Sequence, residues 1–258
     1  MKVNLRAFSG CVWLGFWESL RQRVLAGLAI FLAIAFVMAI LGRDLSVGQD
    51  VKIVKDLGLA VMEVIAVFFA LVGGSSVIAR EVEQRSFYFV LSRPASRASF
   101  VVGKFTGMAV AQAVNLIGLL LVLWAALAFI RAPIDLRLCA AVVGIGFQAL
   151  LAAAMALMFS VFTSPTIAMA GSLSCYIAGR WSDIIRNARE IAPDTPQLLW
   201  DALYLALPNY RYMDFKALAI YGEMVSLEQL ATVAAYAACY VGVALSITVL
   251  RFERRDLR

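Results

Sequence analysis

The chain has 258 residues, of which 63% are hydrophobic and only 16% are charged, with a mean hydropathy of +0.86. A soluble domain of this length needs more polar surface than this composition supplies, so the sequence excludes an ordinary soluble protein and indicates an integral membrane protein. The formal charge of +6 could suggest a nucleic-acid partner, but the basic residues lie beside apolar runs. We therefore assign the excess to membrane topology and expect no nucleic acid.

The N-terminal residues 1–23 precede the first long apolar run. They combine Trp13 and Trp17 with Arg6 and Glu18, a mixture typical of a helix that lies in the membrane interface. The segment is interrupted by charges and has no small-residue cleavage site after an apolar stretch, so we expect it to be retained rather than removed as a signal peptide.

Six apolar runs follow. A bilayer core about 30 Å thick needs roughly 20 helical residues, and each run is close to that length. Between the fourth and fifth runs, Ser164 can cap a helix and Pro165 can occupy its first turn, which predicts a tight hairpin. The fold class is an all-α integral membrane protein with one transmembrane domain over residues 1–258. The predicted spans are residues 24–41, 57–78, 101–130, 138–162, 165–181 and 230–250.

Basic residues set the predicted orientation. Thirteen Lys and Arg fall on the side of both termini and of residues 80–104, against ten on the other side, where eleven Asp and Glu outweigh them. The first side is expected to be cytoplasmic, so both termini are expected in the cytoplasm. The protein itself is expected in the cell (inner) membrane. Residues 182–229 then form an external loop. Within it, residues 198–207 are apolar but too short to cross, which predicts an interfacial or re-entrant helix ended by Pro208.

The segment 80–100 is too long for a simple turn. A helix over residues 80–91 would present charges of both signs and then aromatic side chains, before Ser92-Arg93-Pro94 breaks it. Such a helix is suited to docking into a groove on a soluble partner. The alternative is that its charges are only the solvated ends of two membrane helices, and the pattern alone leaves both interpretations open.

Three stretches here carry a family resemblance. Ala79-Arg-Glu-Val-Glu-Gln-Arg-Ser-Phe87, Leu91-Ser-Arg-Pro-Ala-Ser-Arg97 and Gly103-Lys-Phe105 resemble the signature of type-two ABC permeases, especially those grouped with multicopper-enzyme maturation permeases. Weaker support comes from Leu207-Pro-Asn-Tyr210 and Phe252-Glu-Arg-Arg-Asp-Leu257. The resemblance implies a coupling helix that contacts a separate ATPase. The contact residues that it implies are Glu81, Glu83, Arg85, Arg93 and Arg97.

The chain carries no G-x-x-x-x-G-K-[ST] motif, because Gly103-Lys104 stands alone at the start of a span. It has no histidine, no convincing nucleophile and base, and no metal-ligand cluster. We expect no enzyme activity and no bound cofactor in this chain, with ATP and Mg entering only through the partner ATPase.

Two further features concern the spans. Glu63 lies inside the second span, about two turns from its external end, where a carboxylate is costly; a functional role competes with snorkelling or with a partner such as Arg131. Gly171, Cys175 and Gly179 recur every four residues in the fifth span. Small residues at that spacing let helices approach closely. Packing within the subunit is the first interpretation, whereas the resemblance favours an interface between two permease subunits.

The leading functional hypothesis is a permease subunit that couples ATP hydrolysis by a separate ATPase to substrate export. A second hypothesis is a mechanical transmitter that acts on an external maturation protein without moving a solute, and a third is an ATP-independent secondary transporter. Expected partners are ABC ATPase subunits, a second permease copy or paralogue, an external accessory protein and membrane lipid.

Overall fold

The computed structural model describes residues 5–19, 30–34, 37, 50–83, 97–182, 204 and 207–253. Within these residues every regular element is helical and no strand occurs. The named elements are α1 (Leu5–Ser19), α3 (Asp50–Glu83), α5 (Arg97–Phe129), α6 (Arg137–Ser160), α7 (Pro165–Arg180), the 3₁₀ helix η2 (Tyr210–Met213), α10 (Lys216–Tyr221) and α11 (Leu227–Glu253).

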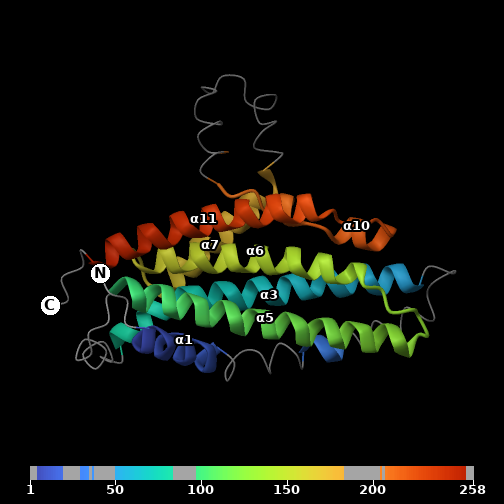
Figure 1. Cartoon of the computed structure of the whole chain (residues 1–258), viewed down its shortest axis with the longest axis horizontal. Coiled ribbons are helices and arrows are strands. Elements are labelled where there is room, and N and C mark those ends of the chain that lie inside the picture. Colours follow the sequence, from blue (N-terminus) through green and yellow to red (C-terminus); the bar gives the residue numbers. More distant parts are fainter. Residues whose placement is uncertain are drawn as a thin grey trace, which may run out of the picture.

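The longest helices, α3, α5, α6 and α11, run side by side in one bundle (Figure 1). Their apolar stretches are long enough to cross a membrane, and the fold is therefore that of a multi-pass membrane protein. The four candidate spans in the described residues are Val51–Val77, Ala98–Phe129, Arg137–Ser160 and Leu227–Phe252.

Two of the six predicted spans have no confirmed counterpart. Residues 24–41 lie mostly outside the described residues. The fifth span begins at Pro165 as predicted, but α7 has only 16 residues. At 1.5 Å per residue it is about 24 Å long, shorter than a bilayer core of about 30 Å.

The helix α3 is longer at both ends than the predicted span 57–78. It begins at Asp50 and continues without a break to Glu83. No proline interrupts it, and the Arg and Glu residues from Arg80 onward are good helix formers. The predicted helix over residues 80–91 is therefore not confirmed: Arg80 to Glu83 form the last turn of α3, and residues 84–91 lie outside the described residues.

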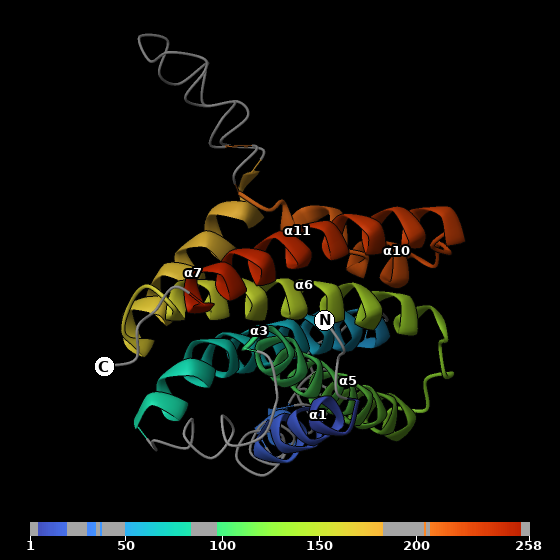
Figure 2. The ribbon, with the colours of Figure 1, turned by 60° about the vertical axis from the view of Figure 1, so that its left-hand side comes forward.

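The helix α6 lies at the centre of the bundle, with α7 and α11 on one side and α3 and α5 on the other (Figure 2). Its alanine-rich face permits close packing, since Ala149, Ala152 and Ala156 are completely buried. A Cβ atom on Gly74 of α3 would lie 2.3 Å from the carbonyl oxygen of Ala153. The backbones of α3 and α6 therefore approach closely at this point.

The N-terminal helix α1 runs beside the first part of α5 (Figure 1). Gly107 makes this contact possible, because a Cβ atom there would lie 2.3 Å from the carbonyl oxygen of Val12. Trp13 and Trp17 remain exposed on the other side of α1. A helix lying along a membrane-crossing neighbour differs from one lying in the interface plane, so the predicted interfacial placement is not confirmed.

The part of the predicted external loop that follows residue 206 packs into the bundle. Tyr210 and Met213 of η2 are completely buried, and α10 packs against α6 and α3. A Cβ atom on Gly144 of α6 would lie 2.3 Å from the carbonyl oxygen of Met213. The predicted surface helix at 198–207 lies outside the described residues, apart from Tyr204 and Leu207.

Candidate functional site

Glu63 lies in the interior of the bundle and is only 5% exposed. It is the fourteenth of the 34 residues of α3, about 20 Å from the start of the helix. From the sequence, Glu63 was expected about two turns from the external end of its span, because the span was predicted to begin at residue 57. The helix α3 begins earlier, at Asp50, so Glu63 lies deeper in the bundle than predicted. A carboxylate at this depth needs partners.

Three side chains from two other elements meet Glu63. The Tyr176 hydroxyl donates to Oε1 at 2.7 Å, and the Lys216 ammonium donates to Oε2. Arg180 Nη1 lies 3.1 Å from Oε1, at ion-pair distance but outside hydrogen-bond geometry. Tyr176 and Arg180 are one turn apart on α7 and so share a face. The partners of Glu63 are therefore these residues rather than Arg131, which lies exposed after α5.

Asp214 adds a second acid to this group. Its Oδ2 accepts from Arg180 Nη2 at 2.7 Å and lies 4.0 Å from Lys216 Nζ. Its Oδ1 accepts from the backbone N–H of Lys216 at 3.2 Å, which fixes the turn before α10. Two acids and two bases thus balance one another. We call Glu63, Tyr176, Arg180, Asp214 and Lys216 the ion-pair cluster.

Gln148 connects the cluster to the central helix. It is completely buried in α6, and its side-chain Oε1 lies 3.3 Å from the Tyr176 hydroxyl. The hydroxyl of Tyr176 has a single proton, which it donates to Glu63. The side-chain amide of Gln148 therefore fits best when it is turned so that its Nε2 donates to the hydroxyl oxygen of Tyr176. The cluster thereby joins α3, α6, α7 and the segment before α10.

The chemistry available to this cluster is electrostatic. Each acid faces a base, so neither carboxylate is free to act as a base or a nucleophile. Across the described residues, no group of three or more His, Cys, Asp or Glu could hold a metal ion. The arrangement can lock helices together, and it would release them if the pairs separated.

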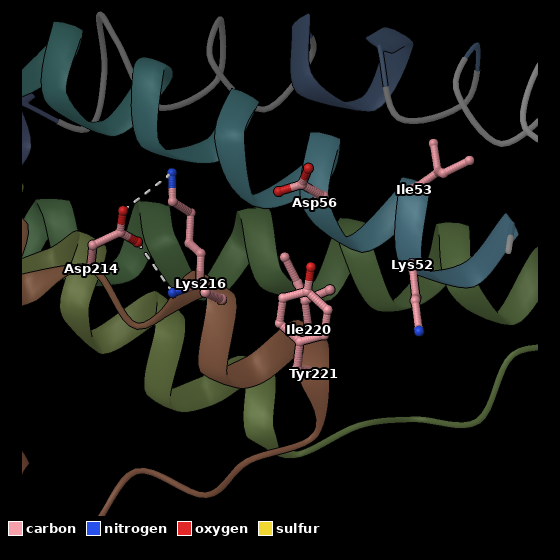
Figure 3. Close-up of a pocket in the computed structure, with 8 residues that line it drawn as sticks. Lys52, Ile53, Asp56, Asp214, Lys216, Ile220 and Tyr221 are labelled. Carbon is pink, nitrogen blue, oxygen red and sulfur yellow. Dashed lines mark hydrogen bonds and ion pairs between the residues drawn. The ribbon is translucent and has the colours of Figure 1, made fainter.

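A cavity of about 500 Å³ opens beside the cluster, between the start of α3 and α10 (Figure 3). Asp214 and Lys216 belong to both the cavity wall and the cluster. The cavity is lined by Lys52, Ile53, Asp56, Asp214, Lys216, Ala217, Ile220 and Tyr221.

A separate ion pair holds this end of α3 to the loop after α5. Lys55 Nζ donates to Asp135 Oδ2 at 2.7 Å. Burial opposes ionisation of Asp135, but the hydrogen bonds from Lys55 and from the backbone N–H of Arg137 outweigh it and hold the pKa of this carboxyl below its ordinary value.

The small-residue face of α7 packs within the chain. Cys175 is 7% exposed, and a Cβ atom on Gly179 would lie 2.1 Å from the carbonyl oxygen of Pro208. A Cβ atom on Gly171 would lie 4.0 Å from the ring of Phe159. These contacts agree with packing within the subunit at Cys175 and Gly179. The interface between two permease subunits at Gly171, Cys175 and Gly179 stays a prediction.

The sequence matches the ABC-2 family transporter protein family over residues 11–257, which is nearly the whole chain. The chain belongs to this family. ABC-2 permeases are the membrane component of transporters and are not themselves catalytic, and membership implies a partner ABC ATPase subunit. No curated protein matches the sequence. The type-two ABC permease indicated by residues 79–105 is confirmed, whereas the multicopper-enzyme maturation group remains a prediction.

Three of the five coupling residues predicted for this ABC-2 permease, Glu81, Glu83 and Arg97, lie at the end of the bundle opposite the cavity. Glu81 and Glu83 are in the last turn of α3, and Arg97 begins α5. The C-terminal end of α3 and the start of α5 both lie on the left of Figure 1, the side away from α10. The side chains of these three residues, and the whole of Arg85 and Arg93, lie outside what the structure describes.

Sequence reasoning found Glu63 in this ABC-2 permease but missed its partners. Arg180 was assigned to the end of a span, and Asp214 and Lys216 to an external loop. The spacing of Tyr176 and Arg180, one helical turn apart at an apolar helix end, was the available signal. Asp214 and Lys216 gave none, because only tertiary packing brings them to Glu63.

Proposed function

We propose that this ABC-2 permease exports a substrate by using ATP hydrolysed on a separate ATPase, with residues 80–100 as the coupling segment. The observation that supports it is the continuity of α3. This helix contains Glu81 and Glu83 at one end, Glu63 in the ion-pair cluster, and Lys52 and Asp56 at the cavity. About 30 Å of unbroken helix separates Glu83 from Glu63.

A rigid helix transmits displacement from one end to the other when the element at its far end has two arrangements. Movement of Glu83 against the ATPase would shift Glu63 relative to Arg180 and Lys216. Separated pairs would leave buried charges without partners, so the cluster favours two discrete arrangements over a continuous series. One arrangement would close the cavity end of the bundle, and the other would open it.

The proposal includes the assembly in which this occurs. The permease works with paired ATPases that bind ATP and Mg, and with a second permease copy or paralogue. It lies in the inner membrane with both termini and residues 80–100 in the cytoplasm. The exposed Trp13 and Trp17 of α1 anchor the N-terminal region at the cytoplasmic membrane surface.

A second candidate function is favoured by the packing of residues 207–221. This segment is held to α3 through the ion pair of Lys216 with Glu63, so motion of α3 could be delivered to an external maturation protein without moving a solute. Such a role would fit the multicopper-enzyme maturation group that residues 79–105 resemble.

Purification of the chain from its native membrane tests the proposal. An ABC ATPase should co-purify in stoichiometric amount, and its turnover in proteoliposomes should depend on the permease. A permease that purifies alone under mild conditions and transports without ATP would contradict it. Coupled ATP turnover that depends on an added external protein, with no solute moved, would favour the second function.

A further inference from the structure

The cavity beside the ion-pair cluster has the dimensions of a small-ligand site. Its volume is about 500 Å³, within the range of roughly 300 to 1,000 Å³ that such sites occupy. Two walls face each other, one formed by the first turns of α3 and one by α10 with the turn before it (Figure 3). Each wall carries one lysine and one aspartate.

The two walls differ in how their charges are compensated. Asp214 and Lys216 are held in the ion-pair cluster. Lys52 and Asp56 are exposed, and neither makes an ion pair with any residue that the structure describes. Lys52 Nζ lies only over the ring of Tyr221, 6.0 Å from its centroid. With respect to the described residues, the wall on α3 therefore presents one uncompensated positive charge and one uncompensated negative charge.

Helix stability does not explain this pair. Lysine in the first turn of a helix opposes the helix dipole, and a lysine four residues before an acid is the less favourable order for a pair along a helix. Both residues nevertheless line the same cavity. Ile53 and Ile220 add apolar surface to the lining.

We propose that this cavity binds a zwitterionic group, with its ammonium against Asp56 and its phosphate or carboxylate against Lys52. A ligand that is only anionic would also meet Asp56 and Asp214, and one that is only cationic would meet Lys52 and Lys216, so both are disfavoured by like charge. The same chemistry is found in a phosphoethanolamine lipid head group and in a free zwitterionic solute. The inference rests on the proposed function and names the class of ligand that the site takes.

Binding to the purified permease in lipid nanodiscs tests this directly. The soluble probe is glycerophosphoethanolamine, compared with glycerol phosphate and with ethanolamine by calorimetry. The zwitterion should bind at least about tenfold more tightly than either singly charged probe. Lys52→Gln and Asp56→Asn should each weaken it about tenfold, as expected for loss of one charge-assisted hydrogen bond.

The sign of the Asp56→Asn effect identifies the ligand class. This variant should weaken binding of the zwitterion and strengthen binding of glycerol phosphate, because it removes a repulsive charge. Arg131→Gln and Glu223→Gln change exposed charges outside the cavity lining, and should leave all three affinities unchanged. Equal preference for glycerol phosphate in the unmodified protein would overturn the proposal, and so would tighter binding of both probes in Asp56→Asn.

The source of the ligand is distinguished by native mass spectrometry from nanodiscs of mixed phosphatidylethanolamine and phosphatidylglycerol. Selective retention of phosphatidylethanolamine, lost in Asp56→Asn, identifies a lipid; binding of the soluble probe without retained lipid identifies a free solute. Absence of both overturns the inference. ATPase co-purification is scored on the same preparations, so a complex that assembles without binding zwitterion contradicts only this inference.

Discussion

The ammonium group of Lys216 donates a hydrogen bond to Glu63, a residue 153 positions earlier in the chain. Both side chains are largely buried, with exposed fractions of 15% and 7%. The contact fixes the start of α10 to the middle of the bundle. The negative charge of Glu63 is needed to balance the positive charges of Lys216 and Arg180.

Glu63→Gln should destabilise the permease by about 3 to 5 kcal/mol, because it leaves Arg180 and Lys216 without their shared anion. Thermal unfolding in detergent measures the loss. Lys216→Met alone should also destabilise, and the double variant should lose less than the sum of the two by at least about 1 kcal/mol. Additive losses would show that the two residues are not coupled.

Gly179→Ala should loosen the packing of residues 207–221 against α7. The added Cβ would lie 2.1 Å from the carbonyl oxygen of Pro208, and overpacking of this kind costs about 1 to 3 kcal/mol. Hydrogen exchange of residues 207–221 and the thermal midpoint measure the effect. Gly242→Ala in α11 is the matched control, since nothing lies within 4 Å of its added Cβ, and it should be neutral or slightly stabilising.

The Lys55 and Asp135 pair should make stability sensitive to acid. The pKa of Asp135 is held below the ordinary aspartate value of 3.8, so the ion pair contributes fully to stability above that pH, and its contribution is lost as the pH falls through the lower pKa of the folded state. Thermal midpoints between about pH 5 and 2 should fall more steeply for the unmodified protein than for Asp135→Asn. Glu228→Gln, an exposed acid on α11, should leave the slope unchanged; parallel curves for all three would refute the assignment.

The Glu81→Lys, Glu83→Lys double variant should release the ATPase while the permease still inserts. Like charge across a docking surface costs several kcal/mol, roughly 100-fold or more in affinity. Membrane yield, ATPase co-purification and ATP turnover are measured together. Glu223→Lys with Glu228→Lys reverses two exposed acids at the cavity end and should keep the ATPase bound. Normal assembly in the first variant would leave residues 80–83 as a solvated helix end.

Single-cysteine labelling tests the orientation of the bundle. Thr163, in the hairpin between α6 and α7, and Glu223, after α10, are exposed near opposite ends of the bundle. A membrane-impermeant reagent added to intact cells should label Glu223→Cys and spare Thr163→Cys, with the native cysteines replaced. The reverse labelling would place residues 80–100 outside and remove them as a site for a cytoplasmic ATPase.

The long apolar helices could be predicted from sequence because membrane insertion depends on length and apolarity, which are local properties. The same holds for the hairpin between α6 and α7, because Ser164 at the N-cap position and Pro165 in the first turn mark the start of a new helix. The predicted end of the second span at Ile78 agrees with the candidate span, which ends at Val77, although the helix itself continues to Glu83. Charged residues end an apolar run, but Arg80 and Glu81 are good helix formers, so they end the hydrophobicity without ending the helix.

The ion-pair cluster could not be predicted beyond Glu63. Arg180, Asp214 and Lys216 each look like ordinary charges near a membrane surface, and their pairing depends on residues 207–221 folding back onto α6. That return relies on Gly144 and Gly179, where only the absence of a Cβ lets the backbone approach. The presence of a glycine in a helix does not indicate, from sequence alone, which other segment packs against it.

The shortness of α7 has a consequence for the lipid around it. If α7 crosses the membrane, its 16 residues are about 6 Å too short for a bilayer core of about 30 Å, and this hydrophobic mismatch would be met by thinning of the bilayer or by a polar helix end that lies below the membrane surface. Arg180 is that end, and it is neutralised by Glu63 and Asp214. Counter-charges supplied by the protein would then let the guanidinium lie below the level of the lipid head groups, where lipid alone would not hold it.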